Sequence, residues 1–197
     1  QPGAKVILTE TTIEATLAGA TVGGGVGVFV TDETIDPGLS APILYLSDST
    51  VRDNGMGAVY IKGEGRYQLI GNDLAGGMIS EKRVSDWDHG DAVFVTAGTG
   101  TPTVWDPDAE LGLLLEDNSM SDSAGAGVFL DGASATLSGN VYEDNGVDLV
   151  WQGCESVDTP EGLDEEPVTS TELCPDYDYT TEDLSMSMYM VESEVEP

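Results

Sequence analysis

The sequence contains very few cationic residues. Only 6 of its 197 residues are lysine or arginine, against 37 aspartates and glutamates, which gives a formal net charge of -31 at pH 7. The last cation is Arg83, so residues 84–197 contain none. Because nucleic-acid binding depends on cations that displace counterions from phosphates, we expect no nucleic-acid partner. The same acidity is also typical of a soluble protein from a saline or calcium-rich exterior.

Long apolar runs and helical periodicity are also missing. No apolar run reaches the roughly 18 residues of a membrane-spanning helix, so we expect no membrane insertion. No stretch has a convincing 3.6-residue apolar period. The opening QPGAKVIL lacks a basic region followed by an apolar one, and it is typical either of a processed chain or of a piece of a longer one.

Cysteine is scarce as well. Cys154 and Cys174 lie in an acidic segment that contains prolines, and they have no CxxC spacing that would indicate zinc or redox chemistry. The alternatives are a pair of free thiols or a disulfide, and we favour the disulfide, which would stabilise this short loop by about 3 kcal/mol. A disulfide implies an oxidising compartment, so we expect a secreted protein, either extracellular or at a cell surface.

Two short patterns alternate along the chain in place of helices. The first is an apolar triplet, and the second is an 11-residue pattern with an apolar third position, a polar cluster and one later apolar residue. The triplets are VFV (28–30), VYI (59–61), VFV (93–95) and VFL (128–130), with VDLV (147–150) as a possible fifth. The longer copies are VILTETTIEAT (6–16), LYLSDSTVRDN (44–54), YQLIGNDLAGG (67–77), LLLEDNSMSDS (113–123) and ATLSGNVYEDN (135–145), the last interpreted as one residue shorter.

These patterns predict short strands joined by turns, repeated at an irregular spacing. Alternating apolar runs bounded by Gly, Asn and Asp are typical of strands and turns, and repetition every few tens of residues indicates a solenoid. We expect inward Val, Ile, Leu and Phe to fill the interior, including the later apolar residue of each copy. The asparagines at or near the bend tolerate left-handed geometry, and we expect them to form amide ladders between repeats. The later apolar residues are Ile13, Val51, Leu74, Met120 and Val141, and the asparagines are Asn72, Asn118 and Asn140.

The repeat resembles that of the right-handed parallel β-helix proteins of the pectate-lyase-like superfamily. The best copies are GVFLDGASATLSGNVYEDN (127–145) and DSTVRDNGMGAVYIKG (48–63), and the resemblance covers about residues 5–152. It implies an all-β, right-handed parallel β-helix (a solenoid) of about five to six coils. We therefore expect a β-helix over residues 1–153 and an acidic, extended and irregular C-terminal tail, tethered by the disulfide, over residues 154–197.

The catalytic motifs of that superfamily are absent from this sequence. Its lyases typically combine calcium-binding carboxylates with a basic residue that removes a sugar proton. Its galacturonases typically carry Asn-Thr-Asp, Asp-Asp, Gly-His-Gly and Arg-Ile-Lys. Arg52 and Lys62 lie on neighbouring faces of one predicted coil, but they form no larger cationic cluster. The chain therefore resembles a non-catalytic member, and we expect no enzyme activity.

Two acidic loops are candidate calcium sites, because carboxylates at alternating positions suit Ca²⁺. DWDHGD (86–91) also contains His89, the only histidine, so acid–base chemistry is a further interpretation of this loop. The alternative for both loops is a solvated polar loop on an acidic protein. The candidate ligands are Asp86, Asp88 and Asp91 in the first loop and Asp106, Asp108 and Glu110 in the second.

The end of the chain contains a further predicted strand at 184–195. Its apolar residues alternate with polar ones, which gives one apolar face at strand period. This strand either caps the chain's own coil or adds to a neighbouring molecule. The sequence shows no N-terminal amphipathic helix that would cap the first coil. The apolar residues of the strand are Leu184, Met186, Met188 and Met190.

The sequence favours a structural function: an extracellular or surface-assembly protein that stacks end to end with itself or binds other surface proteins. A contact between unlike ends of a solenoid makes a filament when it does not close. Two alternatives remain. One is a calcium-dependent carbohydrate-binding or polysaccharide lyase- or hydrolase-like domain, and the other is the C-terminal fragment of a longer surface protein.

Overall fold

The computed structural model describes residues 5–16, 25–31, 42–63, 65–77, 90–96, 112–131, 133, 135–152 and 168–170. Within these ranges all regular structure is β-strand, and every strand pairing is parallel. The same ranges contain no helix of the length and apolarity that crossing a membrane requires. The all-β prediction is therefore confirmed for the described part of the chain.

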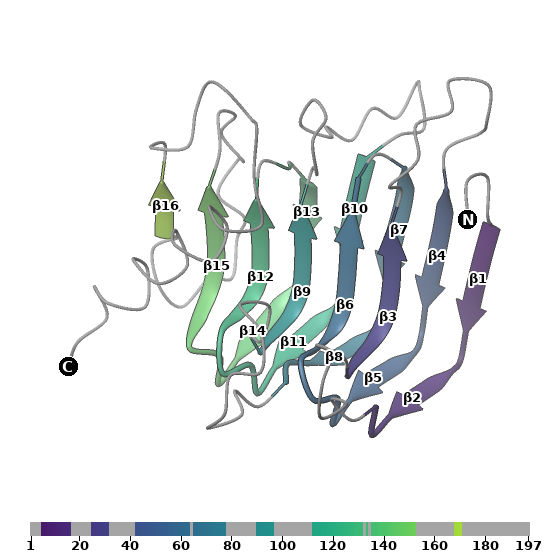
Figure 1. Ribbon diagram of the computed structural model, residues 1–197, viewed down its shortest axis with the longest axis horizontal. Helices are drawn as coiled ribbons and strands as arrows, with labels where there is room; N and C mark the ends of the chain where they lie inside the picture. The colour runs from purple at the N-terminus through teal and green to yellow at the C-terminus, as the bar shows by residue number, and fades with distance from the viewer. Residues whose placement is uncertain are drawn as a thin grey trace.

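The strands form three parallel sheets (Figure 1). Sheet 1 contains β1 (Lys5–Thr9), β4 (Ile43–Ser47), β7 (Arg66–Ile70), β10 (Gly112–Glu116) and β13 (Ala135–Ser138). Sheet 2 contains β2 (Thr12–Glu14), β5 (Thr50–Arg52), β8 (Asp73–Ala75), β11 (Ser119–Ser121) and β14 (Val141–Glu143). Sheet 3 contains β3 (Val26–Thr31), β6 (Gly57–Lys62), β9 (Asp91–Thr96), β12 (Ala126–Asp131), β15 (Val147–Gln152) and β16 (Val168–Ser170).

The chain visits the three sheets in turn. Up to β15, strands that are neighbours within a sheet are three elements apart in the sequence, as in the order β1-β4-β7-β10-β13, whereas β16 directly follows its neighbour β15 among the described strands. We call one passage through sheets 1, 2 and 3 a coil, so that coil 1 is β1–β3 and coil 5 is β13–β15. Equivalent corner residues of successive coils are separated by 38, 23, 46 and 22 positions. The irregular spacing of the repeat is therefore confirmed, because connections of unequal length join strands that stack in register.

The interior is filled by side chains from alternate strand positions. In sheet 1 the third position of the 11-residue pattern gives the column Leu8, Leu46, Leu69, Leu115 and Leu137, and its three middle members are fully buried. In sheet 3, Val28, Val59, Val93 and Val128 form a second inward column. Each coil buries its apolar face only by stacking on its neighbours, which explains why such short strands are stable.

Two details of the predicted register are wrong in the last coil. Met120 pairs with Tyr142, not with Val141, so this copy of the pattern is not one residue shorter. Tyr142 is 3% exposed and Val141 is 49% exposed. In sheet 3, Val128 pairs with Leu149. The fifth triplet therefore begins at Leu149, two residues later than VDLV indicates.

The corner between sheets 1 and 2 has two residues, and each has its own task. The first residue adopts positive φ, between 49° and 66°. From coil 2 on, the side chain of the second residue accepts the backbone N–H of the corner residue in the preceding coil. The asparagines tolerate left-handed geometry, but at this corner the preceding residue takes it. These preceding residues are Glu10, Asp48, Gly71, Asp117 and Gly139.

The expected amide ladder is confirmed at this corner. The Nδ2 atom of Asn72 donates to Oδ1 of Asn118 at 2.9 Å, and Nδ2 of Asn118 donates to Oδ1 of Asn140 at 3.0 Å. All three side chains also donate to a leucine carbonyl of the preceding coil. Because the three residues are at most 5% exposed, these bonds satisfy polar groups that burial would otherwise leave unpaired.

Aromatic side chains form a second stack along sheet 3. The ring centroids of Phe29 and Tyr60, Tyr60 and Phe94, and Phe94 and Phe129 lie 5.0, 4.9 and 5.2 Å apart. Tyr60, Phe94 and Phe129 belong to a cluster that is separate from the main core. The expectation that Phe fills the interior with Val, Ile and Leu is therefore wrong for these residues.

One strand lies in the segment that we predicted to be an irregular tail. β16 pairs with β15 through Val168, Thr169 and Ser170, so sheet 3 extends one strand beyond coil 5. The predicted disulfide between Cys154 and Cys174 and the predicted strand at 184–195 lie outside the described residues.

Candidate assembly edge

Most of the site residues predicted from the sequence lie outside the described ranges. These are Asp86, Asp88, Asp106, Asp108, Glu110, Leu184, Met186, Met188 and Met190. Of the candidate calcium ligands only Asp91 is described. Among the residues that the structure describes, no group of three or more His, Cys, Asp or Glu side chains is placed to hold a metal ion.

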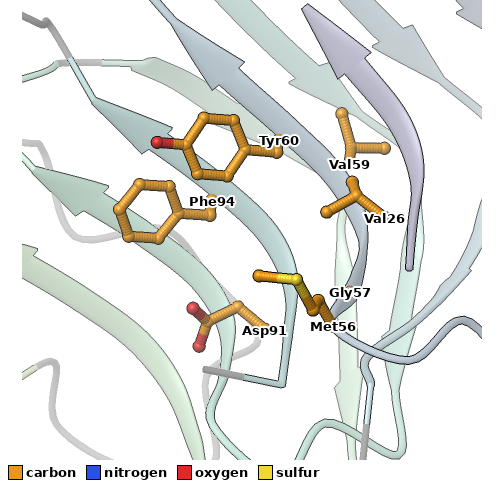
Figure 2. Close-up of a pocket in the computed structure, with 7 residues that line it drawn as sticks. All are labelled: Val26, Met56, Gly57, Val59, Tyr60, Asp91 and Phe94. Carbon is orange, nitrogen blue, oxygen red and sulfur yellow. The ribbon is translucent and has the colours of Figure 1, made fainter. Parts of the chain in front are cut away.

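Asp91 begins β9 and is 4% exposed. Its Oδ1 atom accepts the backbone N–H of Ala126 at 2.6 Å, which links coil 3 to coil 4. Figure 2 shows Asp91 in a small recess beside the stacked rings of Tyr60 and Phe94. Because this recess has room for about one water molecule, it is too small for a sugar or another organic ligand.

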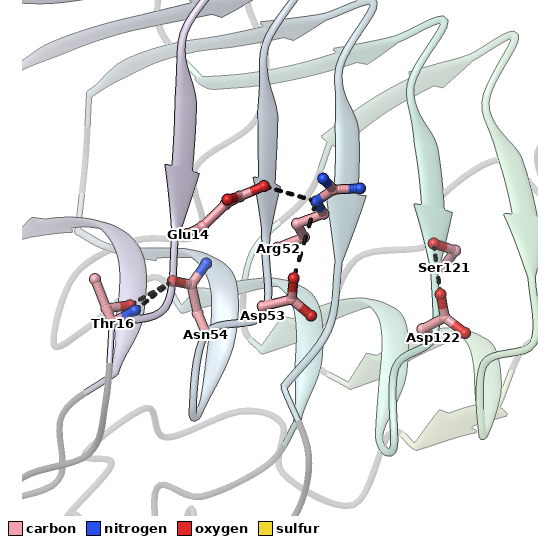
Figure 3. Close-up of polar contacts among 7 residues, drawn as sticks. All are labelled: Glu14, Thr16, Arg52, Asp53, Asn54, Ser121 and Asp122. Carbon is pink, nitrogen blue, oxygen red and sulfur yellow. Dashed lines mark hydrogen bonds and ion pairs between the residues drawn. The ribbon is translucent and has the colours of Figure 1, made fainter.

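The two cations singled out in the sequence lie on consecutive strands of coil 2. Arg52 ends β5 and Lys62 ends β6. Nε of Arg52 lies 2.9 Å from Oε1 of Glu14 in coil 1 and 3.9 Å from Oδ2 of Asp53 (Figure 3). The hydrogen bond to Glu14 is the main cause that raises the pKa of Arg52. Arg52 therefore connects two coils on an exposed face.

The first coil ends all three sheets. Among the described strands, β1, β2 and β3 each have a neighbour on one side only. Val6 is 40% exposed, whereas its equivalents Leu44 and Tyr67 are each 1% exposed. Phe29 is 59% exposed, whereas Tyr60 in the next coil is 7% exposed. Coil 1 therefore exposes Val6 and Phe29, two side chains whose columns are buried in the next coils.

The row of hydrogen-bonded corner residues begins in coil 1 with Thr11. The backbone N–H of Thr11 donates to Oγ of Ser49 at 3.1 Å, and the N–H of Ser49 donates to Oδ1 of Asn72 at 3.0 Å. Oγ of Ser49 itself donates to the carbonyl of Ser47 at 2.7 Å, and Oγ1 of Thr11 makes the matching bond to Thr9 at 3.0 Å. The hydroxyl of Thr11 is therefore oriented as that of Ser49 is, so Oγ1 of Thr11 could accept an N–H from a further coil stacked on coil 1.

The backbone N–H of Thr12 faces the same open side. Its equivalents in the next coils, at Thr50, Asp73, Ser119 and Val141, each donate to the carbonyl of the corner residue in the preceding coil at 2.8–2.9 Å. Thr12 holds that place in coil 1, and no described strand lies beyond β2 in its sheet. Coil 1 thus offers an acceptor at Thr11 and a donor at Thr12.

A second polar corner joins the coils beyond sheet 2. Oδ1 of Asn54 accepts the hydroxyl and the backbone N–H of Thr16, as drawn in Figure 3. Oδ1 of Asn145 accepts the N–H of Ser123 at 3.2 Å in the last two coils. Both corners therefore bond coil to coil in the same direction, from a backbone donor above to a side-chain acceptor below.

Two parts of this edge were missed in the sequence, although the signal was present. Aligning the five copies of the 11-residue pattern places Thr11 and Ser49 in the column of the asparagines, and a hydroxyl accepts a backbone N–H as an amide oxygen does. The middle residue of each apolar triplet is likewise Phe29, Tyr60, Phe94 or Phe129. An aromatic column at one strand position indicates a stack.

Comparisons with protein families, with curated proteins and with solved structures found no match. The geometry of the chain itself therefore carries the functional argument.

Proposed function

We propose that this protein is an extracellular structural protein, a right-handed parallel β-helix similar to non-catalytic members of the pectate-lyase-like superfamily. Three parallel sheets that the chain visits in turn support that architecture. The role we assign is self-assembly through the edge of coil 1. The extracellular location rests on the acidic composition and on the expected disulfide.

The observation that carries the proposal is the exposure of coil 1. Val6 and Phe29 occupy columns that are buried in the next coils, and Thr11 and Thr12 continue a hydrogen-bond pattern that repeats at every lower step. Open sheet edges are templates for pairing with further strands. A further coil from a second copy would bury the two apolar side chains and accept the N–H of Thr12.

A catalytic role has weaker support in the described part of the chain. Arg52 is held by Glu14, and the recess next to Asp91 is too small for a substrate. We therefore propose no reaction. The acidic loops are proposed only as places where calcium would reduce repulsion between copies.

Sedimentation velocity over a wide protein concentration range tests this function. At an ionic strength that screens the net charge, we expect particles heavier than the 20.6 kDa monomer, with a fraction that rises with concentration. Thr12→Pro should lower the association constant roughly tenfold, because it removes one edge N–H, while proline is tolerated on an edge strand. Thr12→Val keeps the N–H and is the matched control.

A particle that stays monomeric at every concentration would overturn the assembly role. Equal association of the Thr12→Pro and Thr12→Val proteins would show that assembly uses a surface other than coil 1.

A further inference from the structure

β16 occupies a place that an incoming copy would need. Sheets 1 and 2 end at β13 and β14, whereas sheet 3 continues past β15 to β16. If β1 and β2 of a second copy paired with β13 and β14, its β3 would lie beside β15 on the side away from β12. That position is the one where β16 pairs with β15.

The two ends of the corner ladder are complementary. At each step, the N–H of a corner residue donates to the side chain of the corner residue in the next coil. The carbonyl of the same corner residue accepts the N–H of the residue that directly follows the corner in the next coil. Asn140 is the corner residue of coil 5, so its N–H and carbonyl face the next level. In a second copy, Oγ1 of Thr11 would accept that N–H, and the N–H of Thr12 would donate to that carbonyl.

We propose that the edge of coil 1 binds coil 5 of a second copy, in the register in which Thr11 takes the next corner position after Asn140. In this proposal β16 blocks the contact until it leaves β15. This proposal rests on the self-assembly function above and specifies its partner surface. A two-fold contact between two coil-1 edges would pair their strands antiparallel. Thr11 and Thr12 would then lack the N–H and carbonyl partners that a corner residue provides at every described step, so the ladder favours head-to-tail contact.

Exchange of β16 for β3 of a second copy would lengthen the pairing. β16 has three residues and pairs with β15 at three positions, whereas β3 has six residues and pairs with β6 at five positions. Phe29 is 59% exposed, and Val150 is its equivalent in coil 5. In the proposed contact, Phe29 of one copy would therefore lie next to Val150 of the other. The two strands therefore compete for the edge of β15. β16 has the advantage of a high effective concentration, because it belongs to the same chain, whereas the incoming β3 forms more residue pairs.

The double variant Val168→Pro, Thr169→Pro tests the block. Consecutive strand residues point their N–H groups to opposite sides, so this pair removes an N–H that faces β15 whichever way β16 is turned. We expect its head-to-tail association constant, measured by sedimentation velocity, to exceed that of the wild type roughly tenfold or more, because the binding-competent state is no longer a minor one. The double variant Val168→Ala, Thr169→Ala keeps both N–H groups and is the control.

The outcomes separate this proposal from the function on which it rests. Association of the wild type with no increase in the proline variant would keep the assembly function and overturn the block. A decrease would make β16 part of the interface and would also overturn it. No association of the wild type at any concentration would overturn the assembly function, and the proposal that rests on it would fall with it. Adding Thr12→Pro to the proline variant should reverse the increase, and persistent association would overturn the proposed register.

Disulfide trapping tests the register without disturbing β16. Oγ of Ser47 donates to Oγ1 of Thr9 at 3.3 Å, so side chains of this column touch between neighbouring coils, and Ser138 holds the same place in coil 5. Strands about 4.8 Å apart suit a disulfide. A mixture of Thr9→Cys and Ser138→Cys proteins should form a mixed crosslinked dimer, and Thr9→Cys with Ser121→Cys should not. Dimers of Thr9→Cys alone would instead support the two-fold contact and overturn the proposal.

Discussion

At the scale of single residues, the last coil differs most from the others in its interior. Tyr142 stands where Val51, Leu74 and Met120 stand in the middle coils. Its side chain is buried, and its hydroxyl has no hydrogen-bond partner among the described residues. Burial raises the pKa of Tyr142, and the charge of Asp148 raises it further. The polar group is therefore a source of instability at the end of the stack.

Tyr142→Phe removes this hydroxyl and should leave the protein equally stable or more stable by about 1 kcal/mol at pH 7, because a buried polar group without a partner costs free energy. The free energy of unfolding from urea titrations measures the change. A loss of about 1 kcal/mol or more would contradict the prediction, since it would mean that the hydroxyl makes a favourable contact in solution.

The raised pKa of Tyr142 also predicts a pH dependence. In the unfolded chain the phenol loses its proton near pH 10, whereas in the folded protein it keeps the proton to higher pH. The folded state then binds more protons than the unfolded state, so stability falls as the pH rises above about 10, by at most about 1.4 kcal/mol per pH unit. Tyr142→Phe should lose less stability than the wild type between about pH 9 and 11, and parallel curves would contradict this assignment.

At the scale of structural elements, sheet 3 is stabilised by its aromatic column as well as by the main core. Phe94 stacks on a ring in each neighbouring coil and is 4% exposed, whereas Phe29 stacks on one ring and is 59% exposed. The two positions belong to one column, so they form a matched pair that differs in burial and in the number of stacked neighbours.

Phe94→Ala should therefore reduce the free energy of unfolding by about 3 kcal/mol, and Phe29→Ala by less than about 1 kcal/mol. Both changes are measured by chemical unfolding at a protein concentration low enough to keep the chain monomeric. Equal losses would show that the column contributes through the strand backbone and not through ring packing. If Phe29→Ala weakens self-association while leaving the monomer stable, the exposed ring belongs to the assembly contact.

At the scale of the whole molecule, the net charge of -31 opposes any contact between copies. Two such molecules repel each other at low salt, where the screening length is long. Arg52 makes two exposed ion-pair contacts, and such contacts contribute little to stability. The proposed assembly would therefore depend on edge hydrogen bonds and apolar burial, and it would need screening of the charge.

The association constant should accordingly rise roughly tenfold or more between about 0.05 and 0.5 M NaCl, where the screening length falls from more than about 10 Å to a few ångströms. Sedimentation velocity at several salt concentrations measures the change. CaCl₂ at equal ionic strength separates general screening from calcium binding, because a larger effect of CaCl₂ would indicate bound cations. Weaker association at high salt would contradict this prediction and would point to attractive ion pairs across the interface.

Much of the fold could be predicted from the sequence because its pattern is local. The third position of each 11-residue copy predicts the leucine column, and the triplets predict the valine column of sheet 3. The errors occur where two adjacent residues are both plausible core residues, as at Val141 and Tyr142. Of the predicted calcium ligands only Asp91 is described, and what it shows is a bond to the backbone of Ala126.

By itself the sequence determined that the chain forms short strands, which residues of a strand point inward, and which asparagines form the amide ladder. Each of these features depends on residues within a few positions of one another. Only the tertiary structure decided which residue takes the left-handed corner, that the Phe side chains stack apart from the core, and that coil 1 is exposed. It also decided the place of β16, whose three residues carry no distinctive pattern. The physical reason is that pairing at an edge depends on which strand is left without a neighbour, and that depends on the whole stack.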